Sequence, residues 1–214
     1  MMREEILEAA AAVESPGGKS DAMRECIQAV TLRSLHESGA FASLCLTGDA
    51  ALRFAGDPSS GLISGNSNGR PATGLGSGHA GYATALEFQL VDKKGYRPEQ
   101  WFFTVRRRLR SMGLDARIAF ARRGPIHSGW IKVSGLLAEA GLSPSPDEAL
   151  GFNIVIGITP LERAACRVKI VEAAGECFAL RYRIPDTLDR QDPTFRRGYQ
   201  LLTLSQSTSP IRDL

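Results

Sequence analysis

Long hydrophobic runs are missing from this chain of 214 residues, which argues against a membrane-spanning protein. The longest apolar stretches, such as LEAAAAV at 7–13, fall well short of the roughly 20 residues that a membrane-spanning helix needs. The acidic N-terminus MMREEILEAA also lacks the basic-then-apolar order of a secretory signal. We therefore expect a cytoplasmic protein without a membrane partner.

Cysteine and histidine are scarce, and neither forms a recognisable site. The four cysteines include no CxxC pair and have no nearby histidine, so we expect buried thiols rather than a zinc site or a disulfide framework. They are Cys26, Cys45, Cys166 and Cys177. The three histidines (His36, His79 and His127) have no cysteine or acid at nucleophile-activating spacing, so no hydrolase triad is indicated.

The composition that remains is typical of a globular α/β domain. Hydrophobic residues make up 43% and charged residues 23% of the chain, and its length allows one domain with a sizeable core. A formal charge of +3 permits contact with nucleic acid without requiring it.

Hydrophobic periodicity predicts three helices and seven strands. We expect helices at 4–13, from Ser20 or Asp21 to His36 with Gly39 in the left-handed position after it, and at 98–112. The run SPGGKS is interpreted as a break between the first two helices. Strands are predicted from ASLCLT, TALEFQLV, DARIAFAR, WIKVS, GFNIVIGIT, CRVKIVE and CFALRYRI, with a short helix or turn at GLLAEAG. A mixed sheet with helices outside it follows.

The predicted helix 98–112 carries a cluster of arginines. Its apolar face is formed by Phe102, Val105, Leu109 and Met112, and Arg106, Arg107, Arg108 and Arg110 surround the remaining faces. A solvated helix face and an RNA-binding patch both fit this pattern, and we favour the solvated face. Trp101 and Trp130 are interpreted as core or interface anchors, since both adjoin apolar residues.

The segment 61–81 is rich in glycine and has almost no large apolar residue. Such a composition predicts a mobile loop, because little surface can be buried to offset conformational entropy. Gly76, Gly78 and Gly81 have G-x-G-x-x-G spacing, but a strand rather than a helix is predicted to follow them. We therefore reject a dinucleotide-binding fingerprint.

The stretch LCLTGDAALRF at 44–54 predicts a strand, a glycine turn at Gly48 and the start of a helix. Free backbone N–H groups at such a helix start attract anions. The later strand TALEFQLV carries a single acid, Glu87. A phosphate-binding turn beside an acidic strand is one interpretation; a helix cap at Asp49 and a strand-surface acid at Glu87 is the other.

Two runs of the sequence resemble the AbiEii/AbiGii toxin family, nucleotidyltransferase-fold proteins of type IV toxin–antitoxin systems. The runs are MRECIQAVTLRSLHESGAFASLCLTGDAALRF at 23–54 and HSGWIKVSGLLAEAGLSPSPDEALGFNIVIGITP at 127–160. The resemblance implies a nucleotidyltransferase-like mixed β-sheet flanked by helices over residues 1–165, with a glycine-rich insertion at 56–82. Residues 166–214 would form strands and an irregular, truncated C-terminal region.

The resemblance also implies a function in phage defence. Family members transfer a nucleotide from an NTP to an RNA or protein acceptor and are controlled by a cognate antitoxin. They hold Mg²⁺ with an Asp-x-Asp pair and a third carboxylate, and a Gly-Gly-Ser/Thr turn cradles the triphosphate. Matched to this pattern, Gly48 is the expected nucleotide-binding residue and Glu87 the expected catalytic residue and metal ligand. The turn and the acidic strand are adjacent in the family's fold, so the resemblance, together with the periodicity, predicts that the strand ending at Thr47 lies beside the strand of Glu87. Asp49, though not a family ligand, could then face Glu87 and bind a single cation with it.

The sequence departs from the family pattern at most of these points. Asp49 and Ala50 stand where the second glycine and the hydroxyl residue are expected, and Ala85 stands at the first aspartate of the pair. The later strand has Asn153, Val155 and Gly157 in place of a lysine and two acids. Two expectations remain open: a toxin component with impaired transfer, and an inactive relative that acts as a binding module or is a decayed copy.

Overall fold

A computed structural model of the chain describes residues 3–55 and 83–184. The glycine-rich segment predicted as a loop, together with His79, lies outside the described residues, as do residues 185–214. The chain divides into two compact units, Met1–Arg183 and Ile184–Leu214, and every element named below belongs to the first.

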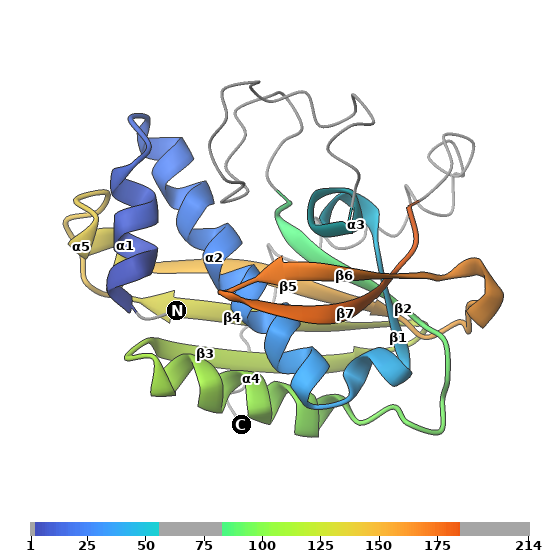
Figure 1. The fold of residues 1–214 in the computed structure, drawn as a ribbon. Helices are drawn as coiled ribbons and strands as arrows, with labels where there is room; N and C mark the ends of the chain where they lie inside the picture. Colours follow the sequence, from blue (N-terminus) through green and yellow to red (C-terminus); the bar gives the residue numbers. More distant parts are fainter. Residues whose placement is uncertain (1–2, 56–82, 185–214) are drawn as a thin grey trace. The chain divides into compact units, whose positions relative to one another are not determined.

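The centre of this unit is a mixed seven-stranded sheet in the order β3-β4-β5-β2-β1-β7-β6 (Figure 1). Strand β1 (Leu44–Thr47) pairs antiparallel with β2 (Ala85–Leu90), and β2 pairs parallel with β5 (Ala149–Gly157). The other strands are β3 (Asp115–Arg123), β4 (Ile126–Ser134), β6 (Arg167–Ala173) and β7 (Glu176–Tyr182). The predicted mixed sheet, with the strand of Thr47 beside the strand of Glu87, is confirmed.

The last two strands belong to this same sheet. Strand β7 lies parallel to β1, with Leu46 opposite Tyr182, and the backbone N–H of Arg183 donates to the carbonyl of Leu46 at 2.8 Å. The boundary expected after residue 165 falls between β5 and β6, so the strands on either side of it share one sheet.

In the described part of the chain the helices that accompany the sheet are α1 (Arg3–Ala11), α2 (Pro16–Glu37), α3 (Gly48–Ala55), α4 (Pro98–Ser111) and α5 (Leu136–Glu139). Short 3-10 turns occupy Ala40–Ala42 and Arg163–Ala165. Among the described residues, none of the helices is both long and apolar enough to cross a membrane.

The start of α2 differs from the predicted one. The helix begins at Pro16, one turn before Ser20, and Ser15 caps it by accepting a hydrogen bond from the N–H of Gly18 at 3.2 Å. The run SPGGKS is therefore a capped first turn and not a break, because proline is well suited to the first helical position. At the other end Gly39 has a φ of +75°, which confirms the predicted left-handed residue.

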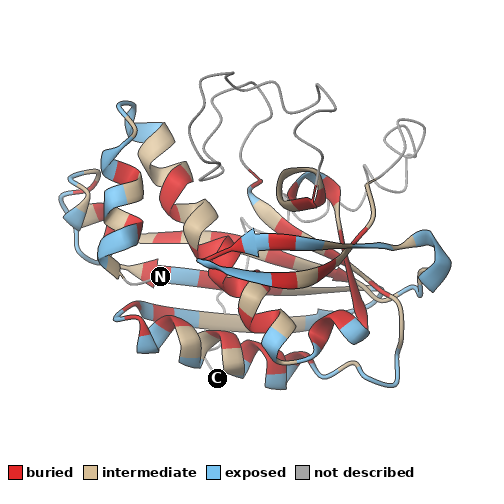
Figure 2. Ribbon diagram, viewed as in Figure 1, coloured by how far each residue is buried: buried red, intermediate tan, exposed pale blue. Residues whose placement is uncertain are grey.

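Alternation along the strands builds a core between the sheet and the helices. Helix α2 packs on β5 and α4 packs beside α2 on the edge strand β3, and the face of β2 and β5 on this side of the sheet is buried (Figure 2). Its residues are Leu86, Phe88, Leu90, Leu150, Phe152, Ile154 and Ile156. Burying each such side chain contributes roughly 2 kcal/mol to the free energy of unfolding. Residues of the opposite parity, including Glu87, are only partly buried, so the second face of the sheet is where a polar site can form.

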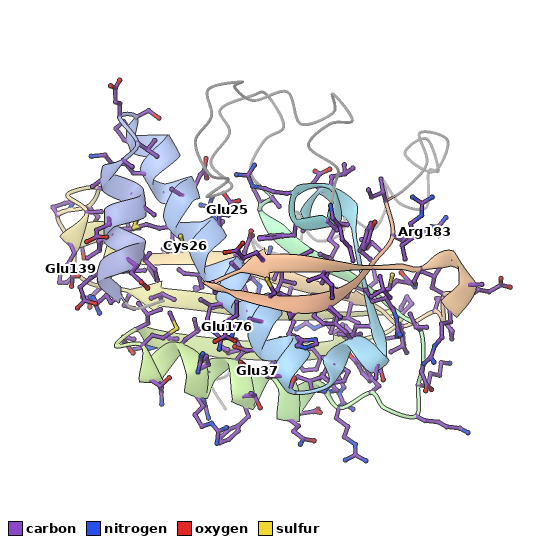
Figure 3. The ribbon with its side chains drawn as sticks, viewed as in Figure 1. Glu25, Cys26, Glu37, Glu139, Glu176 and Arg183 are labelled. Carbon is purple, nitrogen blue, oxygen red and sulfur yellow. The ribbon has the colours of Figure 1, made fainter. Side chains whose placement is uncertain are left out.

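The helix α2 is fixed to the far end of the sheet by an ion-pair network. Arg33 pairs with Glu37 at 2.9 Å and also with Glu176, at the start of β7; both acids are labelled in Figure 3. His36 stacks on Phe178 of β7 at a centroid distance of 5.3 Å. These contacts hold α2, which precedes β1 in the chain, against β7, which lies next to β1 in the sheet.

The thiols are less uniform than the sequence predicted. Cys45 is fully buried, Cys26 and Cys166 are partly buried, and Cys177 is exposed, so the expectation of a buried thiol is wrong for Cys177. Cys177 lies at the start of β7, beside the hairpin turn to β6, where side chains reach solvent. Burial raises the pKa of Cys26 to about 11, so this thiol stays protonated at neutral pH.

Candidate functional site

The turn from β1 into α3 lies directly beside the acidic strand. Thr47 is opposite Glu87 in the antiparallel pair, and its hydroxyl donates to the backbone carbonyl of Glu87 at 3.3 Å. The next residue, Gly48, has a φ of +67° and is the first residue of α3. The strand, glycine turn, helix and acidic strand expected from the sequence are therefore brought together at one point.

Gly48 and the side chain of Glu87 are in close contact. A Cβ atom placed on Gly48 would lie 2.5 Å from Oε2 of Glu87 and 3.0 Å from its carboxyl carbon. Glycine is required here for two reasons, the positive φ and the space that the carboxylate occupies. The position is buried, so the contact is part of the packing at the start of α3.

A carboxylate at this place has an electrostatic consequence. The first turn of a helix carries a partial positive charge, which stabilises a nearby carboxylate and attracts anions in general. With Glu87 lying against the first residue of α3, a phosphate group that approached the same turn would meet a like charge. Gly48 thus has a clear structural role beside Glu87, and its contact with a nucleotide stays a prediction.

Asp49 is the second residue of α3 and is exposed. An acid in the first helical turn is favoured by the helix dipole, which fits the interpretation of Asp49 as a residue that stabilises the helix start. It follows Gly48 directly, so Asp49 and Glu87 flank the same turn. These are the two acids that the sequence proposed as metal ligands.

The neighbouring strand provides no third carboxylate at the matching positions. In the parallel pair of β2 and β5, Ala85 lies opposite Asn153, Glu87 opposite Val155, and Gln89 opposite Gly157. The structure therefore places side by side the positions that the sequence matched to the metal-binding strands. Glu87 is the single acid among these six residues.

This donor set does not fit a site for two cations. In the described ranges 3–55 and 83–184 there is no group of three or more histidine, cysteine, aspartate or glutamate side chains that could hold a metal ion. Mg²⁺ needs six oxygens in near-ideal octahedral geometry and is often bound by one or two carboxylates together with phosphates. Glu87 and Asp49 could supply two carboxylates to a single ion at most.

Asn153 has an unusual feature that the sequence did not signal. Its side-chain oxygen Oδ1 is buried and accepts no hydrogen bond. The residue lies between Ala85 of β2 and Trp130 of β4 on the partly buried face of the sheet. A buried acceptor without a donor is uncommon and destabilising, so Asn153 is a place where an added donor group would be accommodated.

A largely buried ion pair positions α3, and no sequence pattern indicates it. Arg53 of α3 donates through Nε to Glu25 of α2 at 2.7 Å, and a second guanidinium nitrogen contacts the other carboxylate oxygen. Each side chain is 13% exposed. Burial raises the pKa of Glu25 above its ordinary value; the Arg53 guanidinium acts in the opposite direction, and Asp21 adds to the rise. The two residues are 28 positions apart on different helices, so no local pattern reveals them.

A second polar pair lies at the other end of the sheet. The hydroxyl of Tyr96, in the loop before α4, is 2.7 Å from Nδ1 of His127, which belongs to β4. Burial raises the pKa of Tyr96 to about 12, and burial with the nearby Arg122 lowers the pKa of His127. Near neutral pH the phenol is therefore protonated and donates to a neutral imidazole.

No protein-family model matches this sequence, and no curated protein or solved structure matches the chain. The assignment to the AbiEii/AbiGii family rests on the two runs at 23–54 and 127–160 and stays a prediction, whereas the mixed α/β fold is shown.

Proposed function

We propose that this chain is a nucleotidyltransferase-fold toxin component of the AbiEii/AbiGii type, with NTP as substrate and Mg²⁺ as cofactor, whose transfer of the nucleotide to an RNA or protein acceptor is impaired. A cognate antitoxin belongs to the same proposal. The observation that carries it is the meeting of the Gly48 turn with Glu87, on a strand whose neighbour β5 has no acid opposite.

Two properties of this arrangement support the scaffold. A helix start directly after a buried strand offers backbone N–H groups to an anion. Glu87 lies on the adjacent strand, where a carboxylate could share a cation with phosphate oxygens.

The same geometry supports the impairment. Mg²⁺ bound here would polarise the reacting phosphate, and the affinity of the site for Mg²⁺ depends on the number of anionic ligands. This chain offers Glu87 and the exposed Asp49, while Ala85 and Val155 have no ligating atoms. Glu87 also lies against Gly48, where it opposes the negative charge of a triphosphate.

The second candidate function is a binding module without transfer. It is favoured by the contact between Glu87 and Gly48, since a carboxylate fixed against the start of α3 satisfies that helix end without a ligand. In this case Glu87 is a structural residue, and Mg²⁺–NTP has no dedicated site.

One substitution separates the two candidates. Glu87→Gln removes the charge and keeps the shape. If Glu87 is a metal ligand, the variant binds Mg²⁺–NTP more weakly in calorimetry; if Glu87 only occupies the helix start, the variant binds NTP as well or better, because the repulsion is gone. Glu172→Gln on the exposed edge strand β6 removes the same charge away from the turn and serves as the control.

Transfer is tested with radiolabelled NTP and RNA. The unaltered chain should label neither RNA nor itself at a rate comparable with an intact two-metal enzyme. The variant Asp49→Gly, Ala50→Thr, Ala85→Asp and Glu87→Asp restores the turn and the paired carboxylates and should bind Mg²⁺–NTP more tightly. Robust labelling by the unaltered chain that Glu87→Ala abolishes would contradict the impairment.

A further inference from the structure

The positive charge of the chain is concentrated in one segment. Residues 92–123 contain ten of the 26 lysines and arginines but three of the 23 acids, an excess larger than the formal charge of +3 of the whole chain. The segment comprises the loop before α4, the helix α4 itself and the strand β3. Because α4 packs along β3 (Figure 1), this charge is gathered in one part of the fold.

Four residues form a stripe on the outer side of α4. Phe103, Arg106, Arg107 and Arg110 are spaced i, i+3, i+4 and i+7, which places them on one face of a helix. The opposite side of the helix is buried through Trp101, Phe102, Val105 and Leu109. Arg107 and Arg110 are exposed, and Phe103 is 56% exposed. We call these four residues the α4 stripe.

Within the described residues, no member of the α4 stripe forms an ion pair with an acid. In the described part of the structure, the ion pairs involve other basic residues, namely Arg3, Arg24, Arg33, Arg53 and Arg122. The guanidinium carbon of Arg106 lies 5.7 Å from the ring centroid of Phe103. An exposed aromatic ring and three arginines thus lie together, with no acidic partner among residues 3–55 and 83–184.

The basic surface continues beyond the helix. Strand β3 is the edge of the sheet next to α4; its exposed Arg122 lies on the same face of the sheet as α4, whereas the exposed Arg117 and Arg123 alternate to the other face along this edge. Arg122 is paired with Glu99 at the start of α4. The loop that leads into α4 adds the exposed Lys93, Lys94 and Arg97. An anionic chain lying on the α4 stripe would therefore meet further cations at its side.

We propose that the α4 stripe and the adjacent edge strand β3 bind single-stranded nucleic acid. The arginines would contact phosphates, and the ring of Phe103 would offer a surface on which a base can stack. This surface is separate from the turn at Gly48. Helix α4 lies on the face of the sheet where Phe102 meets Gly129, while Glu87 has the opposite parity, so the inference does not depend on the proposed function.

The aromatic ring is the reason for choosing a single strand over an acidic protein or a duplex. Arginines alone would attract any polyanion. An exposed phenylalanine beside an arginine adds affinity only for a partner with flat, accessible rings, and the bases of a duplex are stacked inside it. The three partner classes therefore respond differently to the loss of Phe103.

Binding is measured by fluorescence anisotropy with a short fluorescein-labelled uridine oligonucleotide and the full chain. The double variant Arg107→Gln and Arg110→Gln should bind more weakly and lower the steepness of log K against log salt concentration by roughly 1.4, the value for two phosphate contacts on a single strand. The control is Arg163→Gln with Arg167→Gln, which removes the same charge from exposed positions just before β6 and at its start. The control should keep both the affinity and the salt slope.

The role of the ring is tested by Phe103→Leu, which keeps apolar bulk, and by Phe103→Trp. We expect Phe103→Leu to weaken binding of the oligonucleotide by about fivefold or more and Phe103→Trp to retain it. Equal losses in the test and control double variants would overturn the proposal, as would an unchanged affinity in Phe103→Leu. Displacement by polyglutamate or duplex DNA as effective as by the unlabelled oligonucleotide would also overturn it, in favour of an unspecific polyanion surface.

Discussion

Gly48 and Glu87 are packed so closely that a Cβ atom on Gly48 would lie 2.5 Å from the nearer carboxylate oxygen. Gly113, after α4, also has a positive φ, of +80°, but nothing lies within 4 Å of its added Cβ. The two glycines share the same backbone requirement and differ in their surroundings. Their comparison separates backbone strain from the effect of the carboxylate.

The first prediction uses this pair. Gly113→Ala should lower the free energy of unfolding by about 1–2 kcal/mol, the usual penalty of an alanine in the left-handed region. Gly48→Ala should cost about 1 kcal/mol more, because Glu87 must also be displaced. Adding Glu87→Ala to Gly48→Ala should remove the excess. Urea unfolding measures all three, and equal costs at the two glycines would show that the carboxylate does not hold its place.

The second prediction concerns the ion pair between Glu25 and Arg53. Arg53→Met should destabilise the protein by about 2–4 kcal/mol, because it leaves a mostly buried carboxylate without its partner. The double variant Glu25→Leu and Arg53→Met should recover most of this loss. A double-mutant cycle in urea gives the coupling energy, and additive effects of the two substitutions would contradict the pairing.

The same carboxylate predicts a pH effect. The pKa of Glu25 in the folded protein lies above its ordinary value of 4.5, so the folded state holds this proton more tightly than the unfolded state. The contribution of Glu25 to the free energy of unfolding is complete below about pH 4.5, where its carboxyl group is protonated, and is lost as the pH rises through the folded-state pKa. Relative to Glu25→Gln, the unaltered protein should lose stability across that interval. A difference that stays constant with pH would refute the assigned direction.

His127 predicts the opposite direction. Its pKa in the folded protein lies below the ordinary 6.5, mainly because of burial, with Arg122 adding to the effect and Glu99 opposing it. The unfolded chain therefore binds the proton first, and the stabilising contribution present above pH 6.5 is lost as the pH falls through the folded-state pKa. The loss should be absent in His127→Phe. Thermal melts from pH 8 to pH 5 test it, and an NMR titration midpoint above 6.5 would contradict it.

The last prediction concerns Asn153. Its Oδ1 is buried without a donor, so Asn153→Val should leave the stability unchanged or raise it by up to about 1 kcal/mol. Valine also suits the central strand β5. Ser128→Val on the neighbouring strand β4 is a control for the added apolar surface on the same face. A clear loss of stability in Asn153→Val alone would indicate that the amide group makes bonds that matter.

The sequence predicted the architecture well where periodicity is strong. The alternation in TALEFQLV and GFNIVIGIT and the apolar face of α4 led to the correct elements. The periodicity together with the family resemblance correctly placed the strand of Thr47 beside the strand of Glu87. The start of α2 was wrong because proline and glycine were interpreted as a break, although Ser15 can cap a helix that begins with proline. A proline followed by glycines is compatible with either a helix break or a first helical turn, and the local sequence does not decide between them. The packing of α1 against α2 is consistent with the longer helix.

The side-chain contacts that shape the candidate site could not be predicted from the sequence. The approach of Glu87 to Gly48 depends on the path of the side chain after the strands have paired, and the pair of Glu25 with Arg53 depends on how two helices are placed. The bond between Tyr96 and His127 joins a loop to a strand, 31 positions apart. Such contacts follow from tertiary geometry and leave no regular spacing in the chain.

The place of β7 beside β1 has a consequence for the order in which this protein can fold. Strand β1 is synthesised early. Its neighbour β7, which pairs with it through Leu46 and Tyr182, is among the last described residues to leave the ribosome. Until β7 is synthesised, β1 has an unpaired edge whose residues are buried in the folded protein, and such an edge can pair with strands of other chains. Because this long-range contact forms late and slowly, nascent chains that stop before residue 176 should be prone to aggregation, and completion of the sheet should limit the rate of folding.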